Sequence, residues 1–155
     1  MLKEFTLEGK TALITGGSTG IGKAIALVFA EAGADVAIAA RTFQRLDEAA
    51  EEIRGLSRKV ITIQADVSDR QQADRMIAEA IDGLGRIDVL VNNAGTGGGG
   101  PVVPLPEPPD RPELGYRNPK DHKVAMTDED WHRVLDVNLS AVFYCCRAVA
   151  PAMLE

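Results

Sequence analysis

One junction constrains the fold more than any other feature of the sequence. A short apolar run at residues 10–15 leads directly into Gly16 and Gly17, and a helical spacing of apolar residues begins at Ile21. A short apolar run that ends on glycines is typical of a buried parallel strand. The backbone N–H groups and the dipole of the following helix start favour a bound phosphate, and glycine lets that phosphate approach closely.

Three further strands are predicted downstream, with a helical pattern after each. They are expected at residues 35–40, 59–65 and 87–91, and Gly33 and Gly55 are expected to end the first two helices. Right-handed crossovers put the first three strands on one side and the fourth on the other. The sequence therefore predicts an α/β fold: a single dinucleotide-binding domain with a doubly wound, Rossmann-type parallel sheet of strand order 3-2-1-4.

Two cap-like pairs mark the starts of later helices. Ser68 with Gln71 predicts a capping box for the third helix, and Thr127 with Asp130 predicts one for a long last helix. The last helix is expected to bury one apolar face, which consists of Trp131, Val134, Leu135, Leu139, Val142, Phe143 and Val149.

One segment does not fit regular structure. A glycine run at residues 97–100 is followed by a proline-rich stretch. Such a sequence is incompatible with a regular helix or a central strand. We therefore expect an irregular insert at about residues 96–123, and a loop this long is usually functional or disordered.

Composition and charge exclude several kinds of partner. The formal net charge of -6 leaves no basic surplus to hold a phosphate backbone, so no nucleic-acid partner is expected. No apolar run approaches the length of a membrane span and no signal-peptide pattern is present, so no membrane association is expected.

Cys145 and Cys146 are adjacent and have no nearby His to complete a metal set. They are predicted to be reduced helix residues in a cytoplasmic protein.

The glycine loop admits a second interpretation. Residues 17–23 match G-x-x-x-x-G-K, the core of the P-loop of NTPases, and Asp66 could pose as a magnesium ligand. The next residue is Ala24, where that motif needs Ser or Thr to hold Mg²⁺. The P-loop NTPase is therefore the less favoured alternative.

Four motifs in order resemble a known family. They are Thr15-Gly-x-x-x-Gly20-x-Gly22, Asp66-Val67, Asn92-Asn93-Ala94-Gly95, and Asn138 within Asp-Val-Asn-Leu-Ser. Together they resemble the short-chain dehydrogenase/reductase family over almost the whole chain apart from the insert. The resemblance implies an NAD(P)(H)-dependent oxidoreductase that transfers hydride to or from a carbonyl, hydroxyl or enoyl group of a small-molecule substrate. It also implies a possible homo-oligomer in the complete protein.

The resemblance assigns residues to the cofactor. The glycine loop would hold the adenosine and pyrophosphate side, Asp66 would bond the adenine amino group, and the residues after strand four would line the cofactor's path. The implied cofactor-binding residues are Gly16, Ser18, Gly20, Ile21, Asp66, Val67, Asn93, Ala94 and Gly95. No metal site is implied. Asp66 could instead merely cap the turn after its strand.

The end of the second strand bears on the choice of cofactor. An acidic residue there would bond the ribose 2′-hydroxyl of NAD, but Ala40 occupies that position and Arg41 follows. A planar guanidinium suits a 2′-phosphate, so NADP is favoured over NAD. A solvated arginine at a strand end is the alternative. Thr19 stands where some NADP-using relatives place a second basic residue.

Asn138 is the catalytic residue that the resemblance implies within the chain. In the family it holds a water that links the active-site lysine to solvent, whereas the alternative is a satisfied asparagine in the core. The family's catalytic Ser and Tyr-x-x-x-Lys would follow Asn138, and the chain ends before them. Tyr116 and Lys120 have the right spacing, but Pro119 opposes a helix between them. The chain alone is therefore expected to be inactive, and a non-catalytic dinucleotide-binding module is the alternative function.

Overall fold

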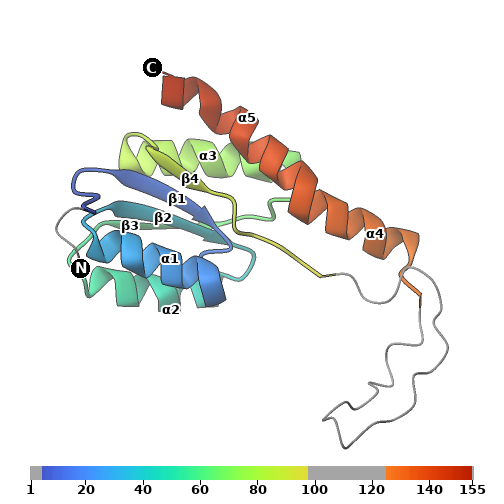
Figure 1. Ribbon diagram of the computed structural model, residues 1–155, viewed down its shortest axis with the longest axis horizontal. Coiled ribbons are helices and arrows are strands. Elements are labelled where there is room, and N and C mark those ends of the chain that lie inside the picture. The colour runs from blue at the N-terminus through green and yellow to red at the C-terminus, as the bar shows by residue number, and fades with distance from the viewer. Residues whose placement is uncertain (1–4, 98–124, 155) are drawn as a thin grey trace, which may run out of the picture.

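A parallel four-stranded sheet forms the centre of the computed structural model, which describes residues 5–97 and 125–154 (Figure 1). The strands are β1 (Thr11–Thr15), β2 (Asp35–Ala40), β3 (Val60–Gln64) and β4 (Val89–Val91). Their order is β3-β2-β1-β4, with every neighbouring pair parallel. The predicted α/β class and strand order are confirmed, and each strand lies within the range predicted for it.

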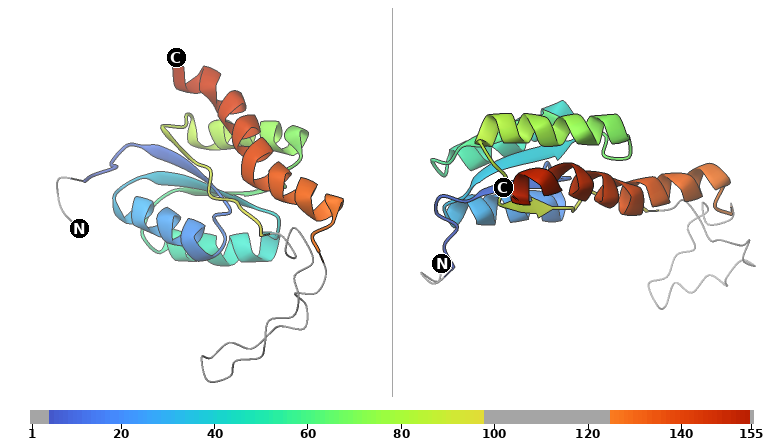
Figure 2. Two further views of the ribbon diagram at one scale, coloured as in Figure 1. Left: turned by 45° about the vertical axis from the view of Figure 1, so that its right-hand side comes forward. Right: turned by 90° about the horizontal axis from the view of Figure 1, so that it is seen from above.

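Helices cover both faces of the sheet. Helices α1 (Gly20–Glu31) and α2 (Phe43–Arg54) lie on one face, and α3 (Arg70–Leu84) and α5 (Ala141–Leu154) lie on the other (Figures 1 and 2). Alternate strand residues therefore enter two separate cores. Ala12, Ile14, Val36 and Ile38 pack with α1 and α2, while Leu13, Ala37, Ala39 and Ile63 pack with α3 and α5. Burial on both faces explains the nearly continuous apolar runs of β1 and β2, whereas β3 and β4 are largely half-buried.

The start of α3 differs from the prediction by one residue. Asp69 is the cap, and its carboxylate accepts the backbone N–H groups of Gln71 and Gln72 at 2.8 and 3.2 Å. The predicted Ser68–Gln71 capping box is therefore wrong. The Ser68 hydroxyl instead donates to Asp66 Oδ1 at 2.7 Å, because that carboxylate closes the turn after β3. Bonds from the Gln72 side chain and backbone hold the pKa of Asp69 below its usual range.

The last helix consists of three consecutive parts. They are α4 (Asp128–Leu135), a π-helical turn η3 (Asp136–Ser140), and α5. The Thr127–Asp130 capping box at its start is confirmed: the Thr127 hydroxyl accepts the Asp130 N–H at 3.1 Å, and the Asp130 carboxylate accepts from Thr127 in return.

The predicted buried face of this helix is largely wrong. Val149 is buried, Val134, Leu135 and Val142 are half-buried, and Trp131, Leu139 and Phe143 are exposed. The side chains that pack toward α3 and the sheet are Ala141, Cys145 and Val149, spaced by four residues. Small side chains allow the two helices to approach closely, and this turns the large apolar side chains away from the core.

The same helix also corrects the expectation about apolar runs. By length and composition alone, the 27-residue stretch Asp128–Leu154 could cross a membrane. One such helix is weak evidence, since length and composition alone do not distinguish a spanning helix from others. Only 17% of its most apolar window is buried, although Ala141, Cys145 and Val149 of α5 do pack into a core. The predicted insert at 96–123, apart from Thr96 and Gly97, and the Tyr116–Lys120 match lie outside the described residues.

Candidate nucleotide-binding site

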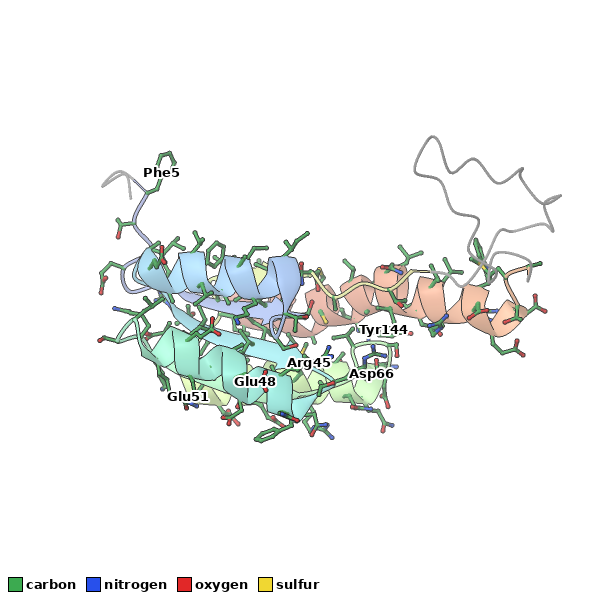
Figure 3. The ribbon with its side chains drawn as sticks, turned by 90° about the horizontal axis from the view of Figure 1, so that it is seen from below. Phe5, Arg45, Glu48, Glu51, Asp66 and Tyr144 are labelled. Carbon is green, nitrogen blue, oxygen red and sulfur yellow. The ribbon has the colours of Figure 1, made fainter. Side chains whose placement is uncertain are left out.

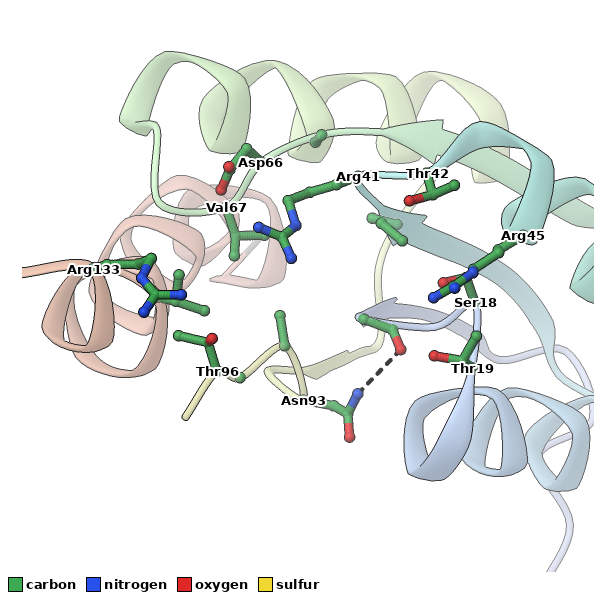
Figure 4. Close-up of a pocket in the computed structure, with 17 residues that line it drawn as sticks. Ser18, Thr19, Arg41, Thr42, Arg45, Asp66, Val67, Asn93, Thr96 and Arg133 are labelled. Carbon is green, nitrogen blue, oxygen red and sulfur yellow. Dashed lines mark hydrogen bonds between the residues drawn. The ribbon is translucent and has the colours of Figure 1, made fainter. Parts of the chain in front are cut away.

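A pocket opens at the edge of the sheet where the parallel strands end. Residues that follow each strand line it, among them Gly16 after β1, Arg41 after β2, Asp66 after β3 and Asn93 after β4 (Figure 4). The cavity volume is about 300 Å³. In doubly wound sheets this edge, near the switch point in strand order, is where ligands bind.

Hydrogen bonds between the ends of β1 and β4 fix the floor of the pocket. Thr15 Oγ1 accepts the backbone N–H groups of Asn93 and Ala94, both at 3.0 Å, and donates to the Val91 carbonyl at 3.3 Å. The Asn93 side-chain amide donates to the carbonyls of Thr15 and Gly16 at 3.0 and 3.3 Å. The Asn93 amide is therefore a brace that ties the glycine loop to β4.

Two glycines are needed for this close packing. Gly16 has φ +65°, a left-handed conformation that side chains disfavour, and a Cβ there would lie 2.9 Å from Asn93 Nδ2. A Cβ on Gly22 would collide with the Gly16 carbonyl oxygen and with the Asn93 amide. The first turn of α1 is thus held directly against the glycine loop.

The two helices that begin beside the pocket have unneutralised amino-terminal ends. Their caps, Thr19 of α1 and Thr42 of α2, make no side-chain cap bond, and neither helix has an acidic residue in its first turn. Helix α3, by contrast, is capped by the Asp69 carboxylate. The Ser18 hydroxyl, 9% exposed, makes no hydrogen bond to any described residue. These free donors and helix dipoles favour an anion.

Three arginines and one carboxylate set the charge of the pocket. Arg41, Arg45 and Arg133 line it, and Asp66 is the only acidic residue among the described lining residues. Within residues 5–97 and 125–154, Arg41 and Arg45 form no ion pair, whereas Arg133 pairs with Asp130 at 2.6 Å. Figure 3 shows Arg45 and Asp66 near the middle of the view, and both line the pocket. In a chain of net charge -6, this local excess of cations suits a multiply charged anion.

Asp66 combines a structural bond with an open acceptor. Its Oδ1 accepts from the backbone N–H of Ser68 at 3.0 Å and from the Ser68 hydroxyl, so it does cap the turn after β3. Its Oδ2 makes no hydrogen bond within the described part of the chain and is left to accept from a ligand. Ala65 and Val67, 3% and 7% exposed, flank it and supply apolar pocket wall.

The pocket brings together most of the residues predicted from the sequence. Eight of the eleven line it: Gly16, Ser18, Arg41, Asp66, Val67, Asn93, Ala94 and Gly95. Gly20 and Ile21 do not; they form the first residues of α1, and the Ile21 side chain is 76% exposed. Asn138 does not line the pocket either.

Asn138 corrects the expectation of a place on a buried apolar face, because it is exposed. Its amide donates to the carbonyls of Thr96 and Val134, both at 2.8 Å, and its Oδ1 accepts the Thr96 N–H at 3.2 Å. Asn138 therefore fastens the segment after β4 to the π-helical turn, and it holds Thr96, which itself lines the pocket.

Sequence reasoning missed several lining residues, above all Arg45, Arg133 and Val137. Arg45 lies four residues after Arg41, in the first turn of α2, so its position near the start of a predicted helix was a usable signal. Arg133 and Val137 come from the last helix. No local pattern indicates that this helix reaches the pocket.

The structure also bears on the other site interpretations. Lys23 Nζ donates to Glu52 on α2 at 2.7 Å and does not line the pocket, which is inconsistent with a P-loop lysine. Cys145 and Cys146 are free, and burial, followed by the charges of Cys146 and Asp74, raises the pKa of the Cys145 thiol to about 11. No group of three or more metal-ligating side chains occurs among the described residues.

Comparison with known proteins decides the family. The family model for short chain dehydrogenases matches residues 10–155. The chain belongs to the short-chain dehydrogenase family. Members of the family are NAD(P)-dependent oxidoreductases that act on small-molecule substrates.

Curated and solved short-chain dehydrogenases agree with this assignment. A 3-oxoacyl-[acyl-carrier-protein] reductase of Thermotoga maritima is 38% identical over 149 residues, which cover 96% of this chain and 52% of the relative. A solved short-chain type dehydrogenase/reductase from Mycobacterium marinum is 38% identical with a TM-score of 0.76, covering 99% and 55% of the two chains. A solved 7α-hydroxysteroid dehydrogenase complexed with NADH and 7-oxo glycochenodeoxycholic acid is 31% identical with a TM-score of 0.80, covering 97% and 51%. The chain spans about half the length of the relatives it matches.

Proposed function

We propose that this chain binds NADP(H) in the pocket at the end of the sheet and that the whole protein is an NADP-preferring oxidoreductase. The observation that carries the proposal is the end of β2. Ala40 and Arg41 line the pocket there, where an acidic residue would be needed to bond the ribose 2′-hydroxyl of NAD. Arg41 has no carboxylate partner among the described residues, so its guanidinium is available to a 2′-phosphate.

The residues present fit the parts of such a dinucleotide. The apolar wall of Ala65 and Val67 with the open Asp66 oxygen suits adenine and its amino group. The uncapped start of α1 suits the pyrophosphate. Arg41, joined by Arg45 and the unpaired Ser18 hydroxyl, suits a phosphate on the adenosine ribose, because charge-assisted bonds to phosphate are strong.

The chain's own contribution to the reaction is to bind and orient. The cofactor supplies hydride chemistry when it is bound, between its nicotinamide and a carbonyl, hydroxyl or enoyl group. The Asn93 brace holds the glycine loop, and Asn138 holds Thr96 at the pocket wall. Such pre-ordered positioning is a large part of enzymatic rate enhancement.

The family alone does not decide between the two cofactors. The solved 7α-hydroxysteroid dehydrogenase, at 31% identity, is a complex with NADH. The choice of NADP for this chain therefore depends on the charge at the end of β2. Localisation in the cytoplasm is part of the same proposal.

The test is a titration of the purified chain with NADPH, NADH and Mg²⁺-ATP, followed by intrinsic fluorescence or calorimetry. We expect NADPH to bind more tightly than NADH and Mg²⁺-ATP to be neither bound comparably nor hydrolysed. Equal or inverted affinity for NADH would overturn the preference. Absence of binding by both dinucleotides would overturn the assignment of the pocket.

A further inference from the structure

Arg133 reaches the pocket from a distant part of the chain. It lies on α4, and Figure 4 shows its guanidinium directed toward the side of the pocket where Thr96 and Val67 lie. Its Nη2 bonds Asp130 Oδ1 at 2.6 Å, and Asp130 is itself fixed by the capping box with Thr127. The arginine is therefore anchored to the start of the helix, although its side chain is about half exposed, at 50%.

The neighbouring walls define what Arg133 can contact. On one side lie Ala65 and Val67, both buried, with the open Asp66 oxygen between them. On the α4 side lie Arg133 and, one helical turn later, Val137. Val67 and Val137 supply apolar surface and Asp66 supplies an open acceptor, a lining that suits a flat heterocycle carrying an amino group. We call this part of the pocket the slot.

We propose that Arg133 closes this slot by stacking its guanidinium on the face of the bound purine, with Asp130 as the positioning residue. This inference rests on the proposed function, because it takes a nucleotide as the ligand. A guanidinium is planar and weakly hydrated and stacks on aromatic faces, whereas the ammonium of lysine is a compact, strongly hydrated charge. The Nη2–H bond to Asp130 lies in the plane of the guanidinium, so it occupies neither face that a ring could stack on.

The stacking model predicts which ligands respond to Arg133. Arg133→Ala should weaken the binding of NADPH, NADH and ADP-ribose by the same factor. That factor is about two- to thirtyfold, the contribution of a cation over an aromatic ring. All three share the purine, and only NADPH carries the extra phosphate. A loss confined to NADPH would show that Arg133 contacts the phosphate, and the proposal would be wrong.

Arg133→Lys separates stacking from charge. Lysine keeps the charge but loses the plane, so we expect it to recover only part of the affinity lost in Arg133→Ala; full recovery of affinity in Arg133→Lys would overturn the stacking role. Asp130→Asn, which frees the guanidinium, should give a smaller loss that is also equal for the three ligands. Arg70→Ala is the matched control, because Arg70 is an exposed arginine on α3 outside the pocket, paired with Asp74. It should leave all three affinities unchanged.

The outcomes separate this inference from the proposed function. If the unmodified chain binds none of the three ligands, the proposed function fails. If it binds them and Arg133→Ala, folded by circular dichroism, binds them equally well, only the role of Arg133 fails.

Discussion

Arg41, just before α2, and Arg45, in its first turn, both line the pocket and have no acidic partner among the described residues. The other described arginines of α2 and α3 do: Arg54, Arg70 and Arg75 each pair with a carboxylate on the same helix. An arginine kept apart from carboxylates in an acidic chain keeps its full attraction for an anionic ligand. The attraction of the pocket for an anionic ligand thus depends on these two side chains.

Replacement of Arg41 tests this at the level of one side chain. Arg41→Ala should weaken NADPH binding about ten- to hundredfold, since a hydrogen bond to a charged group contributes roughly 1.5–3 kcal/mol. NADH, which lacks the phosphate, should bind nearly as before. The measurement is a pair of titrations of the same protein preparation, with Arg70→Ala as the charge-matched control. Equal losses for both cofactors would contradict the assignment of Arg41 to the phosphate.

At the scale of elements, β4, the shortest strand, is held by side-chain hydrogen bonds as well as by its backbone pairing. β4 has three residues and, within residues 5–97 and 125–154, pairs only with β1. Just before it, Asp88 Oδ2 accepts from the Thr11 N–H at 2.9 Å, from the Thr11 hydroxyl at 3.1 Å and from Arg86 Nε at 3.0 Å. Burial alone raises the pKa of Asp88, but these bonds from Thr11 and Arg86 outweigh it, so the net pKa lies below its usual range.

Removal of the Asp88 charge should therefore destabilise the fold in a pH-dependent way. Asp88→Asn is expected to lower the free energy of unfolding by about 1–3 kcal/mol at pH 7, as for loss of charged hydrogen bonds. Because the folded pKa is depressed, this stability is present above about pH 3.9, the ordinary pKa of Asp, and is lost as pH falls through the lower folded value.

Urea unfolding of both proteins between pH 7 and pH 2.5 measures this effect. The difference between the two free energies should shrink as the pH falls below about 3.9, because protonation of Asp88 removes the charge that the bonds stabilise. A constant difference across the whole range would mean that Asp88 acts through packing and not through its charge. Lys23→Met, which breaks the exposed pair with Glu52, is a control expected to show little change at any pH.

The elements also show what the sequence could and could not predict. Apolar runs marked the positions of the strands, and the right-handed crossover rule gave their order, so both were predictable. The N-cap of α3 is Asp69 and not the predicted Ser68. Both residue types can cap a helix, so the sequence alone did not distinguish them. In the last helix, the periodicity of apolar residues did not show which face contacts α3. In the structure α5 packs on α3, and Trp131 and Phe143 are exposed.

The same distinction holds within the site. Arg41 and Asp66 were predictable because each follows a strand, and parallel strands end at a common edge. Arg133 was not, because its place depends on how the last helix docks after a long insert. The alternative of a core asparagine at position 138 is wrong, because Asn138 is exposed and its amide bonds the Thr96 carbonyl.

At the scale of the whole molecule, the chain corresponds to about half the length of its relatives. Among the residues that the structure describes, no tyrosine shares a helix face with a lysine that could help it donate a proton to a reducible substrate. Tyr144 on α5 is followed four residues later by Ala148, so no lysine stands on the same helix face to lower the tyrosine pKa. Tyr116 and Lys120 lie outside the described residues.

We therefore predict that the isolated chain binds cofactor without turnover. General acid catalysis contributes about 10²–10⁴-fold, and the substrate must also be held in register with the nicotinamide. The assay follows NADPH absorbance with a panel of ketones, aldehydes and enoyl thioesters. Turnover that disappears in Tyr116→Phe would show that the residues 116–120 form the active site. Turnover that survives in both Tyr116→Phe and Tyr144→Phe would place the acid elsewhere in the chain.

The hydrogen bonds of the Asn93 amide couple the free energy of cofactor binding to the stability of β4. Because Asn93 joins the glycine loop to the end of β4, a ligand that tightens the loop must also tighten β4, and fraying of β4 must weaken the ligand by the same factor. Amide hydrogen exchange in β4 should accordingly slow when NADPH is added, and Asn93→Ala should abolish most of that slowing while the amides of β2 keep theirs. The outermost strand of the sheet would then report whether the cofactor is bound.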